Sequence, residues 1–293
     1  MSLSIFAMVV IGFAMAESDG SDWMSRISDK VRLSSLTIPG THNSAALREP
    51  LAGTAKCQTL PLAEQLDAGV RFFDLRCCHQ EDRFHIYHGP ISQKLTFDSV
   101  LKTFRDFLLE HPRESLLISI KPESSPRRNS RSFVETLQAY IEEEPQIWHL
   151  GETIPTLGEV RGKLVLLRRF AATEELGFPA TDWGHDGSHK GDTMFVQDRF
   201  EVAQAEIKWN IIRQGLDYSL AQPPGDLLHL HFTSGYRSGA FGVPNISVIS
   251  RSVNQRLSHY LKIAPHQSHG CLVLDFITPD LARAIYQLNF PVK

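Results

Sequence analysis

Three side chains that could cleave a phosphodiester follow three successive apolar segments of the sequence. His42 comes shortly after the first segment, Arg76 directly follows the second, and His88 follows the third. One imidazole can remove a proton from a nucleophile while the other protonates the leaving oxygen. The guanidinium can hold the phosphate in bidentate fashion as negative charge builds on it. These residue types predict metal-independent phosphodiester chemistry if the fold brings them together.

Later apolar segments are also closely followed by, or contain, ionisable residues, namely Lys121, Arg169, Asp198 and Asp275. Burying any of these groups unpaired would be costly, so we expect them to face one polar cleft. A carboxylate behind a base histidine would fix the tautomer of the imidazole. Taken singly, each residue has a plainer explanation. A lone histidine is commonly a hydrogen-bonded structural residue, and Arg76 could form an ordinary salt bridge with Asp74.

The apolar segments that must position these residues are rich in β-formers and recur at residues 33–38, 70–75, 84–87, 116–120, 164–167, 194–196, 227–232 and 272–276. Helical periodicity separates most of them, as at residues 97–109, where apolar side chains repeat on one face. Continuous apolar strands that alternate with amphipathic helices predict a parallel sheet covered on its outside. Eight such strands predict a single-domain, irregular TIM-type (β/α)8 barrel, with reactive groups at the carboxyl ends of the strands.

The composition and the N-terminal residues indicate which partners the protein has and where it is located. The 293-residue chain has a formal net charge of -3 and no basic block, which argues against nucleic acid as a partner. Residues 1–16 are almost wholly apolar and end in Ala14-Met15-Ala16, as before a signal-peptidase cleavage site, although no Lys or Arg precedes them. We expect a signal peptide at 1–16, a linker at 17–32, the barrel at 33–293, and a secreted protein, extracellular or periplasmic.

Four cysteines are present, at Cys57, Cys77, Cys78 and Cys271. They show no CxxC spacing, which argues against a zinc site. Two alternatives stay open in an exported chain: a disulfide from Cys57 to Cys77 or Cys78, or buried free thiols. His229 and His231 alternate on one face of an apolar segment, but no third ligand is evident, and we interpret them as structural residues.

Several segments resemble the bacterial phosphatidylinositol-specific phospholipase C family, whose barrel is called the X domain in its eukaryotic relatives. The most specific are IPGTHNS at residues 38–44 and HGP at residues 88–90. The other matching segments are RFFDLR at 71–76, LISIK at 117–121, GKLVLLRRF at 162–170, VQDRF at 196–200 and VLDF at 273–276. They occur in family order over nearly the whole chain. The resemblance implies a catalytic α/β barrel that cleaves phosphatidylinositol.

The resemblance implies a catalytic role for five residues. His42 is similar to the general base that deprotonates the inositol 2-hydroxyl, and Asp275 to the carboxylate that orients this base. His88 resembles the general acid that protonates the diacylglycerol oxygen. Arg76 matches the phosphate-binding arginine, and Asp74 the carboxylate beside it. The implied reaction releases diacylglycerol and forms inositol 1,2-cyclic phosphate.

Further residues match positions that contact the inositol. Lys121, Arg169 and Asp198 match residues that hydrogen-bond its hydroxyls. Phe200 stands where the family usually has a tyrosine that stacks on the sugar ring. The stacking face is kept in Phe200, whereas the phenolic hydroxyl is lost.

Asn43 departs from the bacterial pattern, in which the residue after the base histidine is commonly an aspartate that supports the general acid. Without that charge, the pKa of His88 should be lower. Asn is instead typical of calcium-dependent relatives, where it binds the ion. Arg76 and Lys121, however, place positive charge where the ion would lie, so we expect no metal and no cofactor.

A membrane-embedded substrate implies apolar groups on the rim of the cleft. Candidates are Leu47 and Leu51 after the first strand, and Tyr236 and Phe241 in a Gly/Ser-rich loop after the seventh. We expect a monomer that acts on phosphatidylinositol at the membrane surface.

Two other functions remain as alternatives. One is a metal-dependent barrel phosphodiesterase for another headgroup, a glycerophosphodiester or sphingomyelin, although the carboxylate cluster that such enzymes need near the first histidine is lacking. The other is a non-catalytic barrel that binds inositol lipids, which Asn43 and Phe200 keep open.

Overall fold

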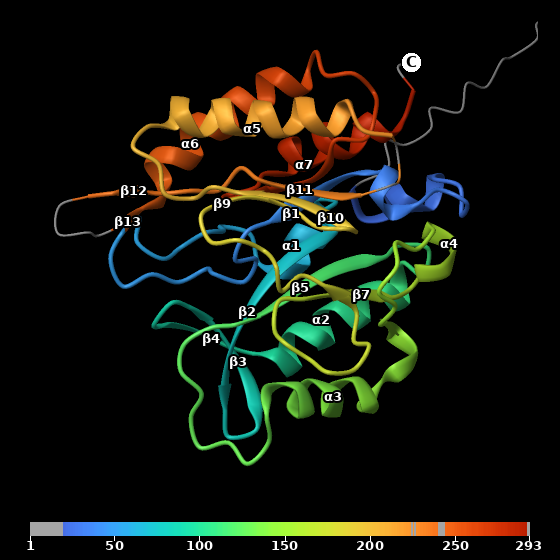
Figure 1. Cartoon of the computed structure of the whole chain (residues 1–293), viewed down its shortest axis with the longest axis vertical. Helices are drawn as coiled ribbons and strands as arrows, with labels where there is room; N and C mark the ends of the chain where they lie inside the picture. The colour runs from blue at the N-terminus through green and yellow to red at the C-terminus, as the bar shows by residue number, and fades with distance from the viewer. Residues whose placement is uncertain (1–19, 224, 226, 240–243, 292–293) are drawn as a thin grey trace, which may run out of the picture.

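A curled, mostly parallel sheet forms the centre of the protein (Figure 1). The computed structural model describes residues 20–223, 225, 227–239 and 244–291. The expected signal peptide and Phe241 therefore lie outside the described residues. In spatial order the parallel strands are β6 (Trp148–His149), β7 (Leu164–Arg168), β5 (Leu116–Pro122), β2 (Phe72–Gln80), β1 (Thr37–Thr41), β14 (Gly270–Leu274), β11 (Leu228–Phe232) and β10 (Met194–Asp198).

Short strands pair with the sheet near each of its two ends. At one end β9 (Gly187–Lys190) pairs antiparallel with β10, and at the other β8 (Phe178–Pro179) pairs with β7. Within the described residues no hydrogen-bonded pairing joins β8 to β10, so the barrel is open on that side. The prediction of an irregular α/β barrel is confirmed, with its first strand beginning at Thr37 because residues Leu33–Ser35 form a 3-10 turn.

The strand sequences are apolar throughout because both faces of the sheet are buried. Along β7, Leu164 and Leu166 belong to the apolar cluster shared with the surrounding helices. Val165 and Leu167 belong to a second cluster, with residues such as Phe232 from β11, on the opposite face of the strand. This alternation leaves the carboxyl ends of the strands as the place where polar side chains can gather.

Seven α-helices are described: α1 (Leu62–Asp67), α2 (Phe97–Glu110), α3 (Phe133–Glu143), α4 (Leu157–Val160), α5 (Ala205–Leu220), α6 (Ile246–Leu261) and α7 (Pro279–Tyr286). The group α5, α6 and α7 lies on one side of the sheet and α2 and α3 on the other (Figure 1). Side chains of Thr96, Ser132, Asn245 and Thr278 cap the first turns of α2, α3, α6 and α7. Within the part described, none of the helices combines the length and apolarity needed to span a bilayer.

The predicted strand at residues 84–87 is not a barrel strand. It forms part of β3 (Arg83–His88), which pairs antiparallel with the extension of β2 and with β4 (Ile91–Thr96). Glu81 and Asp82 both have positive φ, 54° and 55°, and this turn folds the chain directly back on β2. His88 therefore reaches the barrel mouth from a projecting hairpin, and the apolar pattern could not distinguish this hairpin from a parallel strand.

Candidate active site

A cavity of about 450 Å³ opens at the carboxyl ends of the strands. Eight of the ten residues singled out in the sequence line it: His42, Arg76, His88, Lys121, Arg169, Asp198, Phe200 and Asp275. The other two, Asp74 and Asn43, are buried beside it. Asp74 accepts one hydrogen bond from Arg76 and another from the backbone N–H of Asn43. The structure thus brings the whole set to one place.

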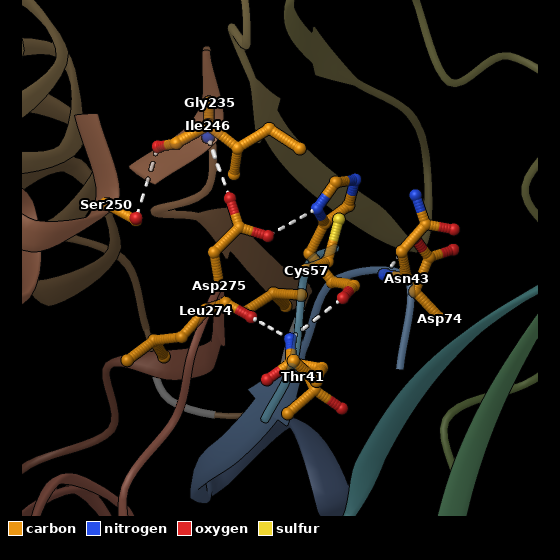
Figure 2. Close-up of polar contacts among 12 residues, drawn as sticks. Thr41, Asn43, Cys57, Asp74, Gly235, Ile246, Ser250, Leu274 and Asp275 are labelled. Carbon is orange, nitrogen blue, oxygen red and sulfur yellow. Dashed lines mark hydrogen bonds and ion pairs between the residues drawn. The ribbon is translucent and has the colours of Figure 1, made fainter. Parts of the chain in front are cut away.

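The pairing of β1 with β14 sets His42 beside Asp275. The two strands are parallel and Thr41 is in register with Leu274, so the residues that follow them emerge side by side. Nδ1 of His42 is 2.8 Å from Oδ1 of Asp275. The other carboxylate oxygen accepts the backbone N–H of Gly235 at 3.3 Å (Figure 2). The carboxylate is held from two sides and orients the imidazole.

Arg76 lies on the other nitrogen of the same imidazole. Its Nη2 is 3.0 Å from Nε2 of His42, which must accept this hydrogen bond because a guanidinium only donates. Nδ1 then carries the proton and donates it to Asp275. This tautomer leaves the Nε2 lone pair directed at the cavity, as a general base requires.

Asp74 is a fully buried carboxylate between two arginines. Its oxygens accept from Arg76 at 3.4 Å and from Arg169 at 3.3 Å. Burial alone would raise the pKa of Asp74, but the two guanidinium charges outweigh it and hold the pKa well below its usual range. Asp74 is thus a fixed negative charge that positions both arginines at the cavity.

His88 faces His42 edge-on across the cavity, with ring centroids 6.4 Å apart. Its Nδ1 is 2.6 Å from the carbonyl oxygen of Ala55, to which it donates, so Nε2 is the nitrogen that can meet a substrate. Burial and the positive charge of Arg76 lower the pKa of His88. A bound phosphate would offset that charge and favour the imidazolium.

Two aromatic contacts shape the far wall of the cavity. The Trp183 ring lies under the Arg169 guanidinium, 3.6 Å from ring centroid to Cζ, and its Nε1 donates to Asp198 at 3.1 Å. Phe200 stacks with Tyr236, with centroids 6.0 Å apart and planes at 26°. This wall offers flat apolar faces next to hydrogen-bonding groups, which suits a polyhydroxylated ring.

Known proteins are similar to this chain in sequence and in backbone structure. Residues 31–170 match the family described as phosphatidylinositol-specific phospholipase C, X domain. The 1-phosphatidylinositol phosphodiesterase of Listeria monocytogenes is 35% identical over 227 residues, which cover 72% of this chain and 68% of that protein. The chain belongs to the phosphatidylinositol-specific phospholipase C family.

Other members of the family extend this relationship. The 1-phosphatidylinositol phosphodiesterase of Staphylococcus aureus strain Newman is 31% identical over 161 residues, 52% of each chain, so this alignment spans about half of that relative. A solved double mutant of the S. aureus enzyme superposes with a TM-score of 0.82 at 22% identity, covering 91% of this chain and 97% of the other. The L. monocytogenes structure gives a TM-score of 0.74 at 24% identity, covering 93% and 99%. These superpositions confirm the fold.

Asn43, the departure from the bacterial family pattern, forms no hydrogen bond with His88 among the described residues. It adopts a positive φ of 43°, which Asn tolerates better than most residues, and its backbone N–H donates to Asp74 at 3.2 Å. Its side-chain Nδ2 is buried and has no hydrogen-bond partner among the described residues. The Ala55 carbonyl holds the His88 ring instead.

Reasoning from the sequence missed two residues of this family site. Glu123 accepts the backbone N–H of Gly89 at 2.7 Å and lies 3.7 Å from Arg76, so it ties the β3–β4 hairpin to the barrel. Its position two residues after Lys121, at the end of a strand, was the available signal. Trp183 lies in a loop outside any periodic segment, and the sequence offered no comparable signal for it.

The sequence left the state of the cysteines open and indicated that His229 and His231 are structural residues. All four cysteines are buried free thiols, so the alternative of a disulfide from Cys57 to Cys77 or Cys78 is not what the structure contains. His229 and His231 both bond Oγ of Ser219, at 2.8 and 2.7 Å.

Proposed function

We propose that this protein is a phospholipase C that cleaves phosphatidylinositol into diacylglycerol and inositol 1,2-cyclic phosphate, without a metal ion. The observation that carries the proposal is the convergence of two imidazoles and one guanidinium on a single cavity. Membership of the family and the name of the L. monocytogenes relative support the substrate class.

The attack begins at His42. Its Nε2 accepts the proton of the inositol 2-hydroxyl, and the oxygen attacks the neighbouring phosphorus within the same molecule. The charge that develops on the imidazolium is stabilised by Asp275, 2.8 Å away at Nδ1. Arg76 moves its hydrogen bond from Nε2 to the phosphate oxygens, where negative charge accumulates.

The departure of diacylglycerol needs a proton on its oxygen. His88 donates this proton from Nε2 while Ala55 holds the other ring nitrogen. Lys121, Arg169 and Asp198 hold the inositol hydroxyls, and Phe200 covers one face of the ring. Hydrolysis of the cyclic product reuses the two histidines with their roles reversed.

The substrate would be drawn from a membrane surface, and the S. aureus relative binds membranes. Leu51 is 63% exposed in the loop that also supplies Thr54 to the cavity wall, and Leu47 and Tyr236 are partly exposed nearby. Vesicle sedimentation of Leu51→Ser should show weaker binding, with the exposed Ile263→Ser as the control. We further propose that the protein acts as a monomer, is secreted, and binds no nucleic acid.

Phosphorus NMR of phosphatidylinositol vesicles incubated with the protein and EDTA tests the main proposal. A resonance of inositol 1,2-cyclic phosphate that precedes inositol 1-phosphate is the expected result. Loss of turnover on chelation would favour the metal-dependent phosphodiesterase for another headgroup. Binding of inositol lipids with no turnover would favour the non-catalytic alternative.

A further inference from the structure

A cysteine that the proposed reaction does not use lies within the site. Cys57 is fully buried in the segment between β1 and α1. Its backbone is held from both sides, since its N–H donates to Ala46 at 2.9 Å and its carbonyl accepts from Phe276 at 2.7 Å. Its sulfur lies 3.7 Å from Nδ1 of His88 and beside the Asp275 carboxylate (Figure 2). The thiol is thus fixed against the residues that perform the chemistry.

Together these side chains have the composition of a metal site. A ring nitrogen of His42, the sulfur of Cys57 and a carboxylate oxygen of Asp275 lie within 4.8 Å of one another. In the part of the chain that the structure describes, this is the one group of three or more such ligands. The group was not foreseen, because the three residues follow no metal-binding spacing in the sequence.

The three ligand atoms are near enough to one another for small side-chain shifts to place them around one tetrahedral ion. Bonds of about 2.0–2.3 Å place neighbouring ligand atoms roughly 3.3–3.6 Å apart. The His42 and Asp275 atoms are 2.8 Å apart, and the sulfur of Cys57 lies within 4.8 Å of the ligand atoms of both residues. Shifts of up to roughly 1 Å in these side chains would bring the three ligand atoms to the separations that an ion requires.

We propose that His42, Cys57 and Asp275 bind a soft divalent ion such as Zn²⁺ or Cd²⁺, and that this ion inhibits the enzyme. A thiolate with imidazole ligands selects such ions over Mg²⁺ or Ca²⁺. The ion would sit on the Nδ1 side of His42, whereas Arg76 occupies the Nε2 side. The fixed positive charge that disfavours an ion at the phosphate position is thus on the opposite side of the ring.

Inhibition follows from the proton that His42 carries. In the active tautomer Nδ1 holds the proton and Nε2 is the base. When the ion binds Nδ1, the proton moves to Nε2, which gives up the hydrogen bond that it accepts from Arg76. The ring can then no longer accept the inositol hydroxyl proton. The thiol proton of Cys57 passes to solvent as the thiolate binds, and no electron is transferred. Inhibition rests on the proposed function, whereas binding of the ion does not.

Titration of the full chain with Cd²⁺ reports binding directly, through the ultraviolet charge-transfer band of a cadmium–thiolate bond. We expect a band that saturates at one equivalent, and loss of phosphatidylinositol cleavage by Zn²⁺ at the same stoichiometry. Cys57→Ala should keep basal cleavage, lose the band, and raise the inhibitory Zn²⁺ concentration by at least about tenfold. Cys78→Ser, which removes a buried thiol of β2, should behave as the parent protein.

Two results would overturn the site: no cadmium–thiolate band in the parent protein, or equal Zn²⁺ inhibition of the parent protein and Cys57→Ala. Cys57→Ser is the second variant should Cys57→Ala not fold. A Cys57-dependent band in a protein that does not cleave phosphatidylinositol would support the metal site and reject the proposed function, so the two failures are distinguishable.

Discussion

The imidazole rings of His42 and His88 face each other edge-on, with centroids 6.4 Å apart and planes at 83°. One ring follows a buried barrel strand, and the other ends the projecting strand β3. Both are close enough to reach oxygens of the same phosphate group, which is what a base and an acid acting on one phosphorus require. The geometry assigns them different partners, Asp275 for His42 and a backbone carbonyl for His88.

The difference in partners predicts different pH behaviour. Burial and then the charge of Arg76 lower the pKa of His88, which acts in its protonated form. The value of kcat/KM should therefore fall as pH rises through a pKa below the usual histidine value of about 6.5. His88→Asn should remove this basic limb and lower kcat by about 10²–10⁴-fold. His85→Asn, on the same strand, is the matched control.

The leaving group offers an independent check of this assignment. An inositol phosphodiester with a nitrophenyl leaving group needs little protonation, so His88→Asn should impair its cleavage much less than cleavage of the lipid. His42→Asn should impair both substrates alike. Equal loss on both substrates in His88→Asn would contradict a role as general acid.

Asp275→Asn tests the orienting carboxylate. The amide is nearly isosteric but can present an N–H to His42 and so favour the wrong tautomer, with the proton on Nε2. We expect kcat to fall by about 10²–10⁴-fold with a small change in thermal stability. Asp280→Asn, in the first turn of α7, should leave kcat unchanged. A fall in kcat that merely follows loss of folded protein would argue against the orienting role.

Much of the fold and site could be predicted because local and global constraints agree. Strands buried on both faces must be continuously apolar, so their ends are visible in the sequence, and parallel strands bring those ends to one side. Asp275 and His42 could be placed at the same end of the barrel on that ground, whereas their pairing was implied by the resemblance to the family. The IPGTHNS and HGP segments then made the family recognisable.

The features of the fold and the site that could not be predicted depend on packing between segments that are distant in the sequence. The β3–β4 hairpin has strand-like residues, and only the turn at Glu81 and Asp82 reveals that it leaves the barrel. Trp183 is placed by its contacts with Arg169 and Asp198 rather than by any periodicity. The position of Cys57 depends on backbone hydrogen bonds to Ala46 and, far along the chain, to Phe276.

A buried ion pair below the site predicts a large stability effect. Arg71 and Glu114 are both fully buried and bonded at 2.7 Å, and the guanidinium also donates to the carbonyls of Gly20 and Ser21. Glu114→Ala would leave the Arg71 charge uncompensated, so we expect a loss of about 3–5 kcal/mol in the free energy of unfolding.

Urea unfolding measures this loss. Glu110→Ala, an exposed substitution at the end of α2, should stay within about 0.5 kcal/mol of the parent protein. Activity per folded molecule should be unchanged in Glu114→Ala, because Arg71 lies outside the cavity lining. If Glu114→Ala lowers the free energy of unfolding by no more than an ordinary surface substitution, the ion pair is not needed to anchor residues 20–26.

The burial of His229 and His231, which share the Ser219 hydroxyl, predicts that acid destabilises the protein. Burial lowers the pKa of His229 to about 4, and burial with the nearby charge of His229 lowers that of His231 to about 3. Both folded-state values lie below the unfolded value of about 6.5, so the unfolded state binds protons first as pH falls. Stability should therefore be full above about pH 7 and decline from about pH 6.5 towards pH 4, by about 1.4 kcal/mol per pH unit for each histidine.

Urea unfolding of a His229→Asn, His231→Asn double variant over this pH range tests the assignment. Its free energy of unfolding should decline less steeply with falling pH than that of the parent protein. The difference in slope should correspond to about two protons, because two titrating histidines are removed. His259→Asn, on the exposed face of α6, should keep the parent slope. An unchanged slope in the double variant would assign the acid sensitivity to other buried histidines, of which His269 is the nearest candidate because burial lowers its pKa as well.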